Sequence, residues 1–144
     1  MLPKTRLDRL VQIRERSEDR ALSNLAKARE MLGRAQQGLS RAVAAAAADH
    51  RTQSDAARWA VEEAAHIRAR QGVNVARGEV SQAAAGEAMA RQGYLAARQQ
   101  AESARRVVDR KRAEIRRGLA KADAKQLDEL GTTAFHRGRA PSGS

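Results

Sequence analysis

Residues 21–46 read ALSNLAKAREMLGRAQQGLSRAVAAA, and apolar side chains recur along this stretch at alternating steps of three and four. Eight consecutive positions of that spacing hold Leu or Ala: Ala21, Leu25, Ala28, Leu32, Ala35, Leu39, Ala42 and Ala46. A mean interval of 3.5 residues is typical of a helix that packs lengthwise against a partner helix in a left-handed supercoil. The stretch therefore predicts one helix of a coiled coil.

A second stretch repeats the pattern and supplies the partner helix. Its seam positions are Val80, Ala83, Glu87, Ala90, Tyr94, Ala97, Ala101, Ala104, Val108, Ile115, Leu119 and Ala122. The chain has 144 residues, 32 of them Ala, and its two prolines, Pro3 and Pro141, lie near the ends, so no proline interrupts a helix between them. We predict an all-α fold, a long antiparallel two-helix coiled-coil hairpin.

Two segments compete for the position of the turn. Gly72, Asn74 and Gly78 tolerate the backbone conformations that end helices, which favours a turn over residues 71–78. The helices would then span about 4–70 and 79–130, with a flexible tail at 131–144. The alternative is the polar run 49–55, which interrupts the apolar seam and would leave unmatched helices of about 45 and 75 residues.

A turn centred on Asn74 fixes which residues face each other. Residue i would oppose residue 148 − i, so Trp59 would pack near Met89 and Tyr94 near Ser54. Packing is the favoured role for both aromatic side chains. Val73 and Val75 would lie at the tip, either closing the hairpin or binding a partner.

Composition argues against an enzyme. The chain has no Cys, which excludes disulfides and thiolate zinc sites, and its three His do not cluster. No phosphate-binding loop or carboxylate pair is present. We therefore expect no catalysis, no cofactor, no metal and no small-molecule ligand. No apolar run is long enough to cross a bilayer and no secretory signal is visible, so a cytoplasmic protein is expected.

Charge is unevenly distributed along the sequence. Residues 1–41 carry a net charge of +5, residues 42–104 carry none, and residues 105–144 carry +6, with 11 basic and 5 acidic side chains. A hairpin places the first and last of these segments side by side. One end of the molecule would then hold the whole excess of +11, which indicates an acidic partner at that end.

The ends of the chain resemble a known family. Residues 7–21 read LDRLVQIRERSEDRA, and residues 125–130 read KQLDEL with Phe135, His136 and Arg137 beyond. Together with the long Ala-rich hairpin, these segments resemble the stalk proteins of type III secretion systems, of the YscO type in injectisomes and the FliJ type in flagella. The seam is richer in Ala than is usual for that family, and residues 131–133 (GTT) interrupt the terminal helix.

The resemblance implies a non-enzymatic stalk or adaptor that is peripherally associated with the inner-membrane secretion apparatus. The end with both termini would enter a hexameric export ATPase, the tip would reach the membrane-embedded export gate, and secretion chaperones would be further partners. The residues implied for the ATPase are Arg6, Arg9, Arg14, Arg110, Arg112 and Arg117. Those implied for the gate are Val73, Asn74 and Val75.

Two other functions remain open at this point. The basic run from Arg105 to Arg117 could bind nucleic acid, although it has no interleaved aromatic residues and matches no DNA-binding signature. The long helices could also pair between chains in a homo-oligomeric spacer. A solvated helix face, partly paired with Asp109 and Glu114, is the simplest interpretation of the basic run.

Overall fold

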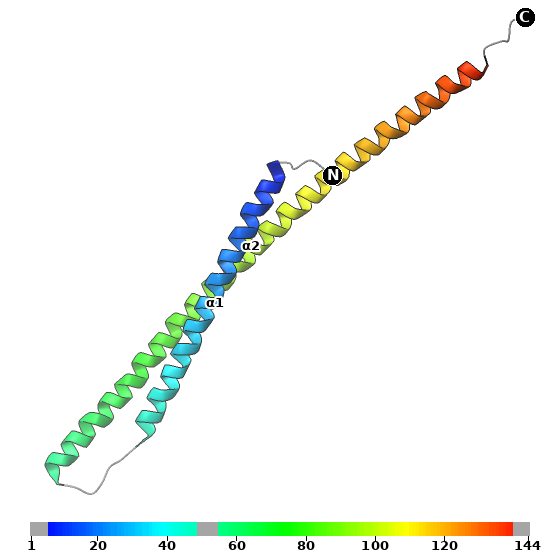
Figure 1. Cartoon of the computed structure of the whole chain (residues 1–144). Helices are drawn as coiled ribbons and strands as arrows, with labels where there is room; N and C mark the ends of the chain where they lie inside the picture. The colour runs from blue at the N-terminus through cyan, green and yellow to red at the C-terminus, as the bar shows by residue number, and fades with distance from the viewer. Residues whose placement is uncertain (1–5, 49–54, 140–144) are drawn as a thin grey trace, which may run out of the picture. The chain divides into compact units, whose positions relative to one another are not determined.

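The computed structural model describes residues 6–48 and 55–139. Within them are two helices and no strand: α1 spans Arg6–Ala47 and α2 spans Ala56–Gly138 (Figure 1). The helices pack against each other, so the predicted all-α helical hairpin is confirmed.

Cross-helix contacts show that α1 and α2 are antiparallel. Arg14 donates to Gln100 over 2.7 Å, and the Arg29 guanidinium lies 3.5 Å from the Glu87 carboxylate. Further along α1, Val43 lines the same groove as Val73 of α2. Later residues of α1 therefore meet earlier residues of α2, and the residue numbers of each facing pair add up to about 116.

The predicted seam of α1 forms its packed face. Every seam position from Val11 to Ala46 is buried or half-buried, and Leu25 is only 3% exposed. Arg14 and Glu18, which interrupt the apolar pattern, also occupy half-buried positions. The spacing of three and four residues thus determines which side of α1 faces α2.

The seam of α2 is longer than the sequence suggested. Positions from Val80 to Val108 are buried or half-buried as predicted, but the same spacing continues backward through Ala76, Val73 and Ala69. It ends forward at Ile115, because Leu119 and Ala122 are exposed. Packing against α1 therefore covers α2 from about residue 69 to residue 115.

The predicted turn at residues 71–78 is wrong. These residues lie inside α2, the first helix ends at Ala47 instead of residue 70, and the second begins at Ala56 instead of residue 79. The second-ranked segment, 49–55, falls between the helices, and residues 49–54 lie outside the described residues. Gly72 and Gly78 permit a turn, but a continuous helix buries Val73 and Ala76 against α1, and this burial favours the helix over the turn.

Asp55 marks the start of α2. Its side-chain Oδ1 accepts a hydrogen bond of 3.0 Å from the backbone N–H of Arg58, and its backbone carbonyl accepts one from Trp59. This is the geometry of an N-cap, in which an acidic side chain satisfies a backbone donor of the first turn and interacts favourably with the helix dipole. The cap explains why the helix begins at Ala56.

Residues 131–138 are helical, so the prediction of a flexible tail from residue 131 is wrong for this part; residues 140–144 lie outside the described residues. The Thr132 and Thr133 hydroxyls donate to the carbonyls of Asp128 and Glu129, four residues back, at 2.8 and 2.7 Å. Such bonds let threonine sit within a helix. Basic residues in the last turn, His136 and Arg137, suit the negative end of the helix dipole.

The new position of the turn also changes the facing pairs. Trp59 and Met89 are 54% and 74% exposed, so the predicted contact between them is wrong. Tyr94 is half-buried in the seam, and its predicted neighbour Ser54 lies outside the described residues. The error is in register: residue i faces about 116 − i because the chain reverses direction before Asp55.

The chain groups into two compact units. One, here called the terminal unit, comprises Met1–Ile13 with Ala101–Ser144, and the other, the hairpin unit, comprises Arg14–Gln100. Among the described residues, the buried apolar ones are Leu25, Ala76, Ala101, Ala104 and Val108. Since each Ala methyl contributes roughly 0.8 kcal/mol when buried, this small core indicates modest stability.

Candidate partner-binding surfaces

In the terminal unit, the start of α1 is joined to the basic segment of α2. Asp8 accepts a hydrogen bond of 2.7 Å from the Arg112 guanidinium, in an ion pair whose side chains are 19% and 46% exposed. An ion pair this exposed contributes only about 0.2–1 kcal/mol to stability. The contact therefore indicates which residues of the two helices face each other, but it is too weak to determine that alignment. The sequence-based expectation that residues 1–41 lie beside residues 105–144 holds only for the start of α1, because Arg14 and Arg29 face Gln100 and Glu87 instead.

Four of the six predicted ATPase-binding arginines remain available at the surface of the terminal unit. Arg6, Arg9, Arg110 and Arg117 are all exposed, and none forms an ion pair with another described residue. Arg112 is engaged with Asp8. The terminal unit as a whole has 14 basic and 7 acidic side chains, which gives +7 of the chain's +11.

Arg14, the sixth predicted arginine, has a different position. It belongs to the hairpin unit, occupies a half-buried seam position of α1 and donates to the Gln100 side chain. A guanidinium held in this way aligns the two helices. Steps of three and four back from Ala21 reach Glu18 and Arg14, so the sequence already indicated that Arg14 lies on the seam.

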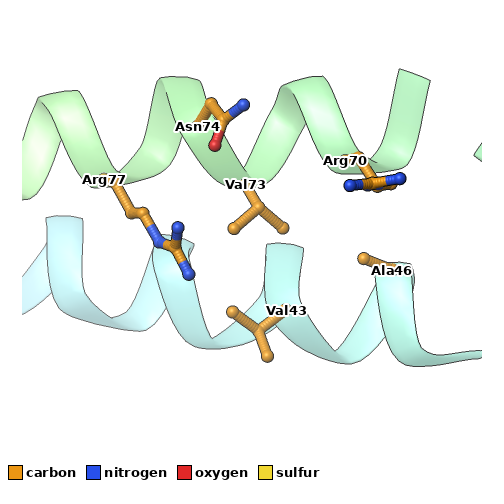
Figure 2. A pocket seen from close by; sticks show the side chains of 6 residues that line it. All are labelled: Val43, Ala46, Arg70, Val73, Asn74 and Arg77. Atoms are coloured by element: carbon orange, nitrogen blue, oxygen red, sulfur yellow. The ribbon is translucent and has the colours of Figure 1, made fainter. Parts of the chain in front are cut away.

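Val73, Asn74 and Val75 do not lie at a tip. Val73 is a half-buried seam residue whose side chain points toward Val43 of α1, between the two helices (Figure 2). Asn74 and Val75 are exposed on the same turn of α2. The three predicted gate-binding residues are thus split between the packed and the solvent-facing sides of one continuous helix.

Sequence reasoning missed the exposed continuation of α2 in the terminal unit. Every described residue from Arg116 to Arg139 is exposed, including four large apolar ones: Leu119, Leu127, Leu130 and Phe135. The Arg139 guanidinium lies 5.6 Å from the centre of the Phe135 ring. The signal in the sequence was the end of the regular spacing at Ile115: further steps of three and four reach Gly118, Ala122, Lys125 and Glu129, so Leu119 is out of register with the seam.

Sequence reasoning also missed a regular column of arginines on α2. Counting by sevens from residue 70 to residue 112 gives Arg70, Arg77, Ala84, Arg91, Arg98, Arg105 and Arg112. Residues seven apart lie on one face of a helix, so Arg70, Arg77, Arg91 and Arg98 share a face within the hairpin unit, as Arg105 and Arg112 do within the terminal unit. The six are here called the arginine column. The contiguous basic run at residues 105–117 is more conspicuous in the sequence than this recurrence of arginine every seven residues.

Comparison with known proteins identifies the family. The family model described as flagellar FliJ protein matches residues 3–140, nearly the whole chain. The chain belongs to the FliJ family. No significant similarity was found among curated proteins or among solved structures.

FliJ proteins are non-catalytic stalk components of the flagellar type III export apparatus, which is cytoplasmic. In that apparatus the family is associated with the export ATPase and the export gate. The match supports the FliJ side of the sequence-based resemblance and not the YscO type of injectisomes. In the part of the chain that the structure describes, neither helix combines the length and apolarity needed to cross a membrane.

Proposed function

We propose that this FliJ-family protein is the stalk of a flagellar type III export ATPase, with the terminal unit entering the ATPase hexamer. The observation that carries the proposal is the pairing of Asp8 with Arg112, a contact between the two ends of the chain within one unit whose net charge is +7. A cationic surface of this kind suits an acidic pore, since complementary charge steers association and disfavours wrong partners.

The ATPase contact is assigned to Arg6, Arg9, Arg110 and Arg117. All four are exposed and lack an ion-pair partner among the described residues, so their charge is available to another protein. Arg112 is left out of the proposed surface because its charge is paired with Asp8. Arg14 acts within the hairpin unit and is not part of the proposed surface.

We assign the contact with the export gate to the first part of α2 and no longer to residues 73–75. Ala46 lines a groove with Arg70, so residues 56–68 of α2 extend past the last described residues of α1. Trp59, Val61 and Ile67 are 54%, 68% and 48% exposed there. Each of these side chains offers apolar area that a bound partner would remove from water. Binding of export chaperones is proposed on the family relationship alone.

Stimulation of the cognate export ATPase tests the proposal. Wild-type protein should raise the rate of ATP hydrolysis by the purified ATPase. The variant Arg6→Glu/Arg9→Glu/Arg110→Glu/Arg117→Glu should lose most of that stimulation, because four attractive contacts become repulsive. Added salt should weaken the wild-type effect, since the contacts are exposed to solvent.

A charge-matched control separates this surface from net charge. Arg16→Glu/Arg20→Glu/Arg41→Glu/Arg68→Glu makes the same change in charge at exposed positions of the hairpin unit. The control should stimulate like the wild type, with circular dichroism confirming that both variants remain helical. Equal loss of stimulation in both variants, or no stimulation by the wild type, would contradict the proposal.

A further inference from the structure

Some arginines of the arginine column have an interaction partner among the described residues and others do not. Arg112 pairs with Asp8, and Arg98 and Arg105 also have interaction partners. Arg70, Arg77 and Arg91 form no hydrogen bond or ion pair with any described residue. Among the residues that the structure describes, the hairpin unit therefore presents three guanidinium groups without a partner on one face of α2.

The facing positions of α1 explain this difference. Arg112 faces an acidic residue, but Arg77 lies beside Val43, and Arg70 lies near Ala46 (Figure 2). Arg29 is itself basic, and its charge is directed to Glu87. The column thus continues along α2 beyond the acidic residues that α1 supplies.

Between these arginines the two helices form an open groove with an apolar floor. Val73 points toward α1, where Val43 is 46% exposed, while Arg70, Asn74 and Arg77 line the α2 side (Figure 2). Small exposed residues extend the same stripe in both directions, namely Ser81, Ala84 and Ala88 on α2 and Ser40 and Ala47 on α1. None of these lining residues is acidic.

We propose that this groove of the hairpin unit binds an acidic amphipathic helix of a partner protein as a third helix. Carboxylates at intervals of seven residues would pair with Arg70 and Arg77, and the apolar side of the helix would cover Val43 and Val73. The surface is separate from the arginines assigned to the ATPase, so the inference goes beyond the proposed function.

The spacing favours a helix over a nucleic acid as the occupant. Seven residues at 1.5 Å each place successive arginines of the column about 10.5 Å apart along α2, which is the repeat of one face of a partner helix. Duplex DNA carries a charge about every 1.7 Å along its axis and offers no apolar face to the two valines. A groove with small residues on its rims also allows close approach of another helix.

A designed peptide provides the probe. It has about four heptads, with Leu and Ala on one face, Glu at every seventh position beside that face and a fluorescent label. Anisotropy titration with the full-length protein should show saturable binding. The variant Arg70→Glu/Arg77→Glu should bind about tenfold more weakly, because two exposed ion pairs are replaced by repulsion.

The matched control is Arg41→Glu/Arg68→Glu, which makes the same change in charge at exposed positions about half a turn away from the groove on each helix. It should bind like the wild type, and a peptide with the same composition but shuffled Glu spacing should bind weakly. The proposal is overturned by no saturable binding, by equal weakening in both variants, or by duplex DNA binding more tightly than the peptide with the same dependence on Arg70 and Arg77.

Discussion

At the residue scale, one large side chain carries much of the packing of α1. Leu25 is 3% exposed, whereas the buried positions of α2 are Ala76, Ala101, Ala104 and Val108. Alanine seams allow two helices to approach closely but bury little area per residue. The packing of this hairpin therefore depends unusually strongly on a single leucine.

Replacing Leu25 with Ala should destabilise the protein by about 2–3 kcal/mol, the lower part of the range for buried leucines, because a two-helix structure leaves no enclosed cavity. Urea unfolding followed by circular dichroism measures the change. Leu22→Ala, at a position that is 48% exposed, is the control and should cost about 0.5 kcal/mol. Equal costs at the two positions would show that Leu25 is not the packing centre.

At the scale of the elements, the period of the seam was predictable from sequence and the ends of the helices were not. Leu and Ala at alternating spacings identified the packed side of α1 and of α2. The turn was misplaced because Gly72 and Gly78 were weighed as individual turn formers. Two local signals outweighed them: the seam through Val73 and Ala76, and the N-cap at Asp55.

Gly72 and Gly78 lie inside α2, so replacing either with Ala tests where the turn is. The free energy of unfolding should rise if the turn precedes Asp55 and should fall for at least one of them if the turn is at residues 71–78. A Cβ built on Gly72 or Gly78 meets no atom within 4 Å, and no described glycine has positive φ. Each of Gly72→Ala and Gly78→Ala should therefore stabilise the protein by about 0.5–1 kcal/mol, measured by thermal or urea unfolding. A turn at 71–78 would make at least one of them destabilising.

At the scale of the whole molecule, the pairing of the N-terminal segment with the basic part of α2 was predictable, but its register was not. The hairpin topology alone suggested that the two segments meet, and the Asp8–Arg112 pair agrees with that for the start of α1. The partner-binding residues were separable only in part. Val73 has sequence surroundings like those of its neighbours, and burial in the seam sets it apart.

Distances between two spin labels in the terminal unit test the register. The chain has no cysteine, so labels can be placed at will. The pair Arg9→Cys/Lys111→Cys should give a short distance, and Arg9→Cys/Arg137→Cys a distance longer by up to about 39 Å, because 26 helical residues separate the two sites on α2. The register 148 − i would reverse this order.

Because arginine recurs every seven residues on α2, α1 could be shifted along α2 by seven residues and keep similar contacts. A shift of α1 by one heptad would bring Asp8 opposite Arg105 in place of Arg112 and would exchange alanine for alanine at many positions of the interface. Electrostatics and small side chains therefore leave neighbouring alignments nearly degenerate. The choice among them falls to residues that do not recur every seven positions, chiefly Tyr94 and the Arg29–Glu87 pair, which favour one alignment of the two helices over its neighbours.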